Sequence, residues 1–123
     1  MIPIPQKIRK EISSDQSYET CMLSNVFGHI CGGRITMEHA IIVGGSRLQK
    51  KWAIISICAK AHEVYEYQDA HTMNKELNVW VALNRASDEE LKAISKAENY
   101  IRKRDYLNQK YGVYTPPLPA YES

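Results

Sequence analysis

The chain lacks any apolar run long enough to cross a membrane. Its longest, residues 53–59, is interrupted by Ser56 and falls short of the roughly 18–20 apolar residues that a transmembrane helix needs. The N-terminal stretch MIPIPQKIRK carries charge but no apolar core, which is not typical of a secretory signal. The sequence also has no repeats and no low-complexity blocks. These absences predict a cytoplasmic protein without a membrane segment.

Cysteine is scarce, with three residues at positions 21, 31 and 58. An odd number of widely spaced cysteines is not typical of a disulfide framework. In a reducing compartment such cysteines either ligate a metal ion or pack as small apolar side chains. The sequence leaves both alternatives open.

The composition is that of an ordinary globular protein, with 44% hydrophobic and 24% charged residues among 123. This length predicts one domain, over residues 1–112, with a core at about 21–71 and a helical part over 72–112. Residues 113–123 are rich in proline and are expected to form a tail. The formal net charge of +2 is compatible with a nucleic-acid partner but does not require one.

Short extended segments are predicted between Cys21 and Cys58, and helices are predicted after Cys58. Polar and apolar residues alternate over 34–37, and residues 53–57 are rich in β-branched side chains, so both segments are predicted strands. We expect them to form a hairpin-like pair with a long basic connection. Helices are predicted over residues 6–12, 59–67 and 75–84. The pattern as a whole predicts a small α+β fold.

A last helix has the clearest boundaries. Ser87 and Glu90 form the S-x-x-E pattern of a capping box, which predicts the start of the helix. Apolar residues follow at helical spacing as far as Leu107, and Gly112 is expected to end the helix.

Chemically active residues surround the two predicted strands. The first two cysteines precede the first strand, and Glu38 and His39 end it. The second strand runs into Cys58, and His62 follows one turn into the next predicted helix.

In this order the segments resemble the HNH endonucleases, whose fold has a ββα-metal core. The stretch CGGRITMEHAIIVGG is similar to the first motif of that family. There an acidic residue or a histidine supplies a metal ligand, and the histidine after it is the general base. The stretch WAIISICAKAH is similar to the third motif. The resemblance covers roughly residues 21–71 and leaves out the helical C-terminal part.

The resemblance implies a metal-dependent endonuclease that hydrolyses DNA phosphodiester bonds. His39 would take a proton from the attacking water, a role suited to an imidazole with an ordinary pKa of about 6.5. One divalent cation, Mg²⁺, Mn²⁺ or Zn²⁺, would be held by Glu38 and His62 and would stabilise the leaving 3′ oxygen. Glu66, one turn after His62, is the expected third ligand, with His71 in reserve.

A second metal site is implied as well. The family's structural zinc takes Cys pairs, or Cys pairs with one His, and the resemblance implies a structural Zn²⁺ on Cys21, Cys31 and Cys58. Ala61 stands at the partner position of Cys58, so the fourth ligand is open, with His29 as a candidate.

The middle Asn of the family's motif is missing, and Trp52 or Ala53 occupies its approximate place. In the family this Asn tethers the loop that carries the catalytic histidine. The Glu38-His39 pair is also compatible with an ordinary solvated pair at a strand end.

The expected partner is DNA, contacted through its phosphates. The candidate contacts are the basic residues near the predicted site, Arg34, Arg47, Lys50 and Lys51. Two other interpretations stay open. One is a catalytically inactive, zinc-stapled module that binds nucleic acid or protein. The other is a partner-binding protein of a phage or mobile element that uses the last helix as its surface. The oligomeric state is open.

Overall fold

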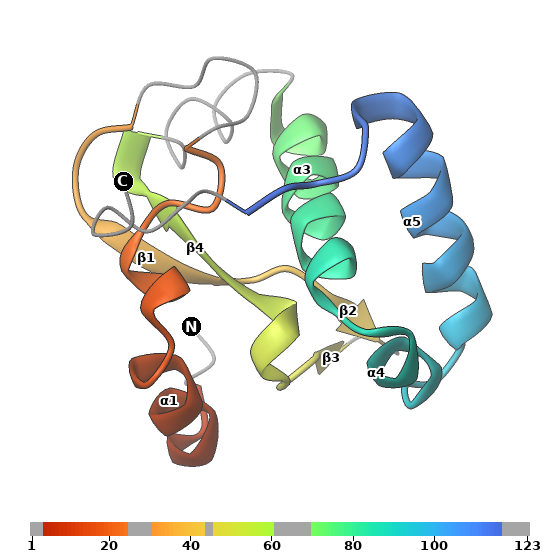
Figure 1. Cartoon of the computed structure of the whole chain (residues 1–123), viewed down its shortest axis with the longest axis horizontal. Coiled ribbons are helices and arrows are strands. Elements are labelled where there is room, and N and C mark those ends of the chain that lie inside the picture. Colours follow the sequence, from red (N-terminus) through yellow and green to blue (C-terminus); the bar gives the residue numbers. More distant parts are fainter. Residues whose placement is uncertain (1–3, 25–30, 44–45, 61–69, 117–123) are drawn as a thin grey trace.

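The computed structural model describes residues 4–24, 31–43, 46–60 and 70–116. Strands β1 (Ile35–His39) and β4 (Ile54–Cys58) form an antiparallel pair, and β2 (Ile42–Val43) and β3 (Ser46–Arg47) form a smaller one. The helical elements are α1 (Gln6–Ser13), η1 (Gln16–Glu19), η2 (Lys51–Ala53), α3 (Ala70–Arg85), α4 (Asp88–Lys92) and α5 (Ala97–Tyr111). The α+β fold that the sequence predicts is confirmed (Figure 1).

The central feature is the pairing of β1 with β4, as the sequence predicts. The register sets Ile35 opposite Cys58 and His39 opposite Ile54. All residues of β4 are buried, whereas those of β1 are half-buried. The difference follows from the packing, because β4 contacts α3 and η1 as well as β1. A run of β-branched residues is well suited to such a covered strand.

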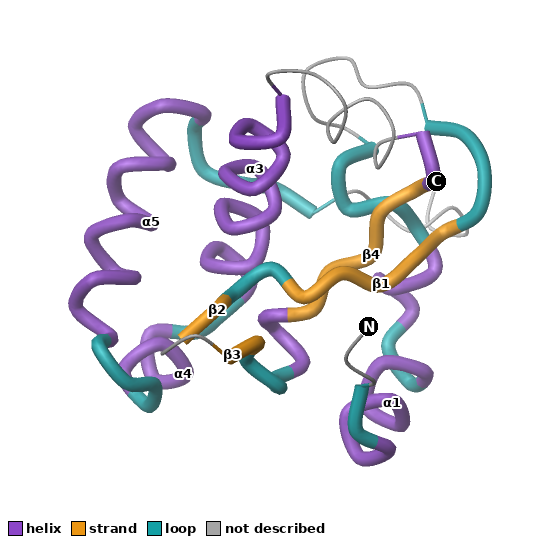
Figure 2. Tube along the Cα trace, turned by 180° about the vertical axis from the view of Figure 1, so that it is seen from behind, coloured by secondary structure: helices purple, strands orange, loops and turns teal. Residues whose placement is uncertain are grey.

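Helices α3 and α5 lie beside each other on one side of the strand pair, and α1 lies on the other (Figure 1, Figure 2). The apolar side predicted for α3 is confirmed, since Leu77, Trp80 and Val81 are buried. Among the described residues, no helix combines the length and apolar character needed to span a membrane.

The predicted last helix is in fact two helices. The capping box forms as expected, because the Ser87 hydroxyl accepts the Glu90 N–H at 3.1 Å and the Glu90 carboxylate accepts the Ser87 N–H at 3.0 Å. Helix α4 then ends, and α5 begins after Lys96, whose φ of 59° is left-handed. The apolar spacing continues through this turn, so the sequence pattern does not reveal it.

The segment after α5 crosses α3 and returns to the strands (Figure 1). Gly112 ends α5 with a φ of 89°, as the sequence predicts. The indole N–H of Trp80 donates to the Gly112 carbonyl at 2.8 Å, and the Tyr114 ring packs edge-on against Trp80. The sequence assigns Tyr114 to a tail, but the structure buries it. The packed domain therefore reaches at least to Tyr114.

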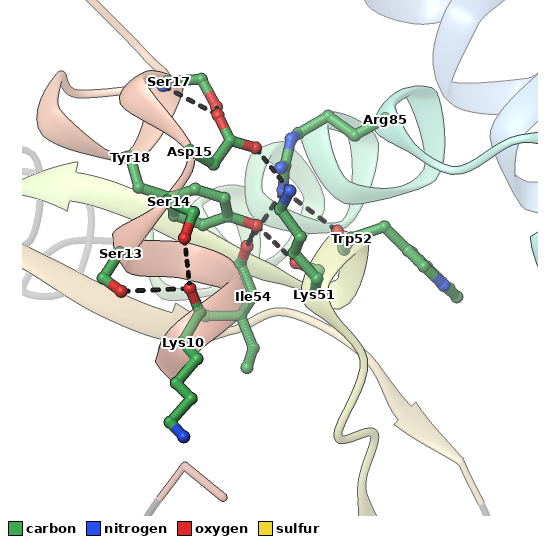
Figure 3. A network of polar contacts seen from close by, with 10 residues as sticks. All are labelled: Lys10, Ser13, Ser14, Asp15, Ser17, Tyr18, Lys51, Trp52, Ile54 and Arg85. Atoms are coloured by element: carbon green, nitrogen blue, oxygen red, sulfur yellow. Dashed lines mark hydrogen bonds and ion pairs between the residues drawn. The ribbon is translucent and has the colours of Figure 1, made fainter. Parts of the chain in front are cut away.

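The N-terminal segment is tied to η2 and β4 through Tyr18 and Arg85 (Figure 3). The Tyr18 hydroxyl lies within hydrogen-bonding distance of the carbonyls of Lys51 and Ile54. The Arg85 guanidinium donates to the carbonyls of Ile54 at 3.0 Å and Trp52 at 3.3 Å. It also lies 4.7 Å from the centroid of the Tyr18 ring. These contacts fix the turn that leads into β4.

Candidate functional site

The three cysteine sulfurs meet at one end of the strand pair. The Sγ atoms of Cys21, Cys31 and Cys58 all lie within 4.8 Å of one another. A tetrahedral Zn²⁺ with Zn–S bonds of about 2.3 Å holds its sulfurs about 3.8 Å apart. The three side chains therefore fit one metal ion with little adjustment. The expectation that these cysteines converge is confirmed.

Backbone pairing along the free edge of β4 brings Cys21 beside Cys58. The Met22 N–H donates to the Ser56 carbonyl at 2.8 Å, and the Ser56 hydroxyl donates to the Thr20 carbonyl at 2.6 Å. Ser56 is fully buried, so these bonds satisfy its polar atoms inside the core. Sequence spacing alone does not reveal that residues 20–22 run along β4.

Cys31 reaches the cluster from the other edge, through the turn that precedes β1. The Ala59 N–H donates to the Arg34 carbonyl at 2.8 Å and closes this turn. Gly33 has a φ of 80°, and a Cβ atom there would come within 2.8 Å of the Ala59 Cβ. Only glycine permits both this backbone conformation and this close approach.

The surroundings of Cys21 and Cys31 disfavour ionisation of their thiols. Burial raises the pKa of the Cys21 thiol, and the backbone N–H groups of Cys58 and Leu23 counteract this only in part. Cys31 is exposed as a residue, but its sulfur faces the two buried cysteines. Loss of water around that sulfur, and then the neighbouring sulfurs, raise the pKa of Cys31 to about 12. A bound cation would supply the charge that lets the thiols ionise.

Glu38 and His39 lie toward the opposite end of β1. Glu38 is paired with Ile55 and His39 with Ile54, whereas the cysteine end is marked by the pair Ile35 and Cys58. At about 3.4 Å per residue, Glu38 lies roughly 10 Å along the strand from that end. The cysteine cluster and the Glu38-His39 pair are thus separate sites.

The His39 ring has a defined partner. Its Nε2 atom lies 3.0 Å from the Oε1 atom of Gln49, in the connection between β3 and η2. The Ala40 N–H donates to the Ala53 carbonyl at 2.9 Å and closes the base of the same loop. Gln49 is not among the residues that the sequence predicts for the site. The motif places its amide at about positions 52 and 53, whereas the amide that contacts the imidazole is a few residues earlier in the chain.

Several predicted ligands lie outside the described residues. These are His62 and Glu66, expected to bind the catalytic cation, and His29, a candidate for the zinc. Only the backbone of His71 is described, at the start of α3. Residues 59–60 are helical directly after β4, as predicted. The catalytic cation and its ligand set stay a prediction.

The four basic residues expected to contact DNA differ in their surroundings. Arg34, Arg47 and Lys50 are exposed, at the start of β1 and around the loop that carries Gln49. Lys51 forms an ion pair with Asp15, with 2.8 Å between Nζ and Oδ2. Lys51 therefore already has a role in holding η2 to the N-terminal segment.

The structure thus contains two separate candidate sites: three thiols close enough to hold one metal ion, and the end of β1, where Glu38 precedes a histidine whose ring contacts Gln49. No family model, no curated protein and no solved structure matches the chain. Its function is therefore inferred from the residues themselves.

Proposed function

We propose that the protein is a metal-dependent, HNH-type endonuclease that hydrolyses DNA phosphodiester bonds. The observation that carries the proposal is the layout of the β1–β4 pair. Glu38 and His39 lie toward one end of it, the cysteine cluster lies at the other, and the chain becomes helical directly after β4. The HNH resemblance implies this order of a catalytic pair, a zinc cluster and a helix.

In the proposed reaction, His39 accepts a proton from a water molecule whose oxygen attacks the phosphorus. The bond between phosphorus and the 3′ oxygen breaks, and the leaving oxygen takes a proton from solvent. The products are a 5′-phosphate and a 3′-hydroxyl. Adjacent strand residues point to opposite faces, so Glu38 and His39 would have different roles, Glu38 as a ligand of the cation and His39 as the group that faces the water. A bound divalent cation supplies charge compensation for the phosphate and the leaving oxygen.

The two metal sites would hold different ions for chemical reasons. Thiolates favour Zn²⁺, so Cys21, Cys31 and Cys58 would hold a structural zinc. A carboxylate with imidazole ligands is compatible with Mg²⁺, Mn²⁺ or Zn²⁺, so the site built around Glu38 would bind one of these three ions. Its other proposed ligands are the sequence-predicted His62, Glu66 and His71.

DNA would be held through its phosphates. Arg34, Arg47 and Lys50 are exposed basic side chains near the two ends of the strand pair and are the proposed contacts. Phosphate contacts position the duplex without reading its sequence, so weak sequence preference is expected.

The test is cleavage of supercoiled plasmid by the purified protein in Mg²⁺, Mn²⁺ or EDTA. We expect nicking that EDTA abolishes and that His39→Ala and Glu38→Ala each reduce by at least about a hundredfold. Glu89→Ala, which removes an exposed carboxylate from α4, is the matched control and should cleave normally. Absence of cleavage with every metal, or equal cleavage by His39→Ala, would contradict the proposal.

A second candidate is a catalytically inactive, zinc-stapled module that binds nucleic acid or protein. The converging cysteines favour it as much as they favour a nuclease, because the zinc site does not itself cut DNA. A module of this kind would bind DNA equally well with and without His39 and would not cleave it. A gel-shift titration of the wild type and His39→Ala, run beside the plasmid assay, separates the two candidates.

A further inference from the structure

We propose that Gln49 is the positioning residue for His39: its side-chain oxygen holds the imidazole with the proton on Nε2 and presents Nδ1 as the proton acceptor. The catalytic consequence rests on the proposed nuclease function. The protonation pattern of the ring is a property of the chain and can be measured without any reaction.

The assignment follows from the two atoms in contact. An amide oxygen can only accept a hydrogen bond, so the 3.0 Å contact with Gln49 Oε1 places the ring proton of neutral His39 on Nε2. The lone pair then lies on Nδ1, which becomes the nitrogen able to take a proton from water. Catalytic histidines are commonly oriented in this way, through a hydrogen bond on the ring nitrogen that does not react.

The backbone on both sides of Gln49 is fixed. The Leu48 N–H donates to the Ile41 carbonyl at 2.9 Å, and the Ala53 N–H donates to the Lys50 carbonyl at 3.0 Å. Gln49 therefore extends its side chain from a segment held at both ends. An orienting group on such a segment loses little freedom when it makes its hydrogen bond.

The next turn of the chain is also held, by residues far away in the sequence. Tyr18 and Arg85 engage the carbonyls of η2 and the start of β4 (Figure 3). Contacts from the N-terminal segment and from the end of α3 thus hold η2, which follows closely after Gln49 in the chain. They therefore help to fix the loop from which Gln49 contacts His39.

This arrangement accounts for the missing Asn of the motif. Trp52 and Ala53, which occupy its approximate place, are buried at 5% and 0% exposure and belong to the core. The amide that secures the loop is instead on Gln49, and it binds the imidazole directly rather than through the backbone.

The experiment compares two substitutions of similar size. Gln49→Glu keeps an acceptor oxygen at the same reach, and Gln49→Leu removes it. Gln109→Leu, on the exposed face of α5, is the matched control. The first readout is the pair of ¹⁵N ring shifts of His39 in EDTA, measured at one fixed alkaline pH. The second is single-turnover cleavage of DNA with metal added.

We expect the Nε2–H form of the ring to dominate in the wild type, Gln49→Glu and Gln109→Leu, and the two forms to mix in Gln49→Leu. Cleavage by Gln49→Leu should be slower by about ten- to a hundredfold at unchanged DNA affinity, as for a misaligned catalytic group. Gln49→Glu should cleave faster than Gln49→Leu.

Two results would overturn the proposal. One is a proton on Nδ1 in the wild type, and the other is a Gln49→Leu protein with wild-type ring shifts. Failure of the nuclease function gives a different pattern, in which the ring shifts change in Gln49→Leu although the wild type cuts no DNA. In that case Gln49 still positions His39, and the function of His39 is something other than DNA cleavage.

Discussion

The hydroxyl of Tyr114 donates to the carbonyl of Met22 at 2.7 Å and so links the end of the packed chain to the residue beside Cys21. Met22 also pairs with β4 through its N–H. Burial raises the pKa of Tyr114, which favours the protonated hydroxyl that donates this hydrogen bond. The segment after α5 thus supports the backbone that presents the first cysteine.

Removal of this hydroxyl should weaken both the fold and the metal site. Tyr114→Phe leaves the buried Met22 carbonyl without its partner, which we expect to cost about 1–2 kcal/mol of unfolding free energy. Groups that orient metal ligands typically contribute about tenfold or more to affinity, so we expect zinc affinity to fall by about tenfold. Urea unfolding and competition with a zinc chelator measure the two effects. Tyr106→Phe, at an exposed tyrosine of α5, is the control. Unchanged zinc affinity in Tyr114→Phe would limit the role of Tyr114 to stability.

The cysteine cluster should bind one zinc ion per chain. Elemental analysis of the purified protein is expected to give about one Zn²⁺, and Cys31→Ser should lose it. Cys31 is the informative position because it is exposed, so its substitution leaves the core intact. Removal of the metal should lower the melting temperature, and zinc binding should weaken as pH falls because protons compete for the thiolates. A zinc-free protein whose stability is the same with added zinc would show that the three thiols are only packed side chains.

Some of this structure can be predicted from sequence because it depends on local chemistry. The β-branched run of β4, the capping box at Ser87 and the glycine that ends α5 are each set by a few adjacent residues. The convergence of the cysteines was also predicted, but only through the resemblance to a family. Their spacing along the chain says nothing about distance in space.

The missed features depend on tertiary contacts. Gln49 is one polar residue among several in a basic loop, and only the folding of that loop brings it to His39. Tyr114 follows a helix-ending glycine and precedes prolines, a context typical of a tail, yet Trp80 and Met22 hold it in place. The turn at Lys96 interrupts no apolar spacing, so no periodicity can reveal it.

Arg85 should be among the most sensitive polar positions of the fold. Arg85→Ala removes hydrogen bonds to the carbonyls of Trp52 and Ile54 together with a cation–π contact to Tyr18. We expect a loss of about 2–3 kcal/mol of unfolding free energy, measured with urea. Arg85→Lys should recover only part of it, because an ammonium group cannot reproduce the planar set of donors.

The control for this loss is Arg102→Ala on α5. The Arg102 side chain bonds only within its own exposed helix among the described residues, so its removal should cost at most about 0.5 kcal/mol. Equal losses at the two arginines would mean that the contacts of Arg85 contribute no more than those of a surface side chain.

Asp15 gives the fold a defined dependence on acid. Burial opposes ionisation of this carboxyl, but hydrogen bonds from Lys51 and Ser17 outweigh burial and lower its pKa from 3.8 to about 2. A carboxyl whose pKa is lower in the folded state than in the unfolded state stabilises the fold fully at pH values above the unfolded-state pKa. This stabilisation is lost as the pH falls through the folded-state pKa. The side chains of the ion pair are 27% and 36% exposed, so after allowance for solvent we expect about 1 kcal/mol at neutral pH.

Asp15→Asn tests this directly, because an amide still accepts the Ser17 N–H that caps η1 while the charge is removed. The variant should be less stable than the wild type by about 1 kcal/mol at pH 7, and the difference should shrink between about pH 4 and pH 2. Urea unfolding across that range measures it. Asp105→Asn, at an exposed carboxylate on α5, should show little difference at any pH. If the difference in unfolding free energy between wild type and Asp15→Asn is as large at pH 2 as at pH 7, its source is hydrogen bonding by the neutral carboxyl. That result would exclude the ion pair as the source.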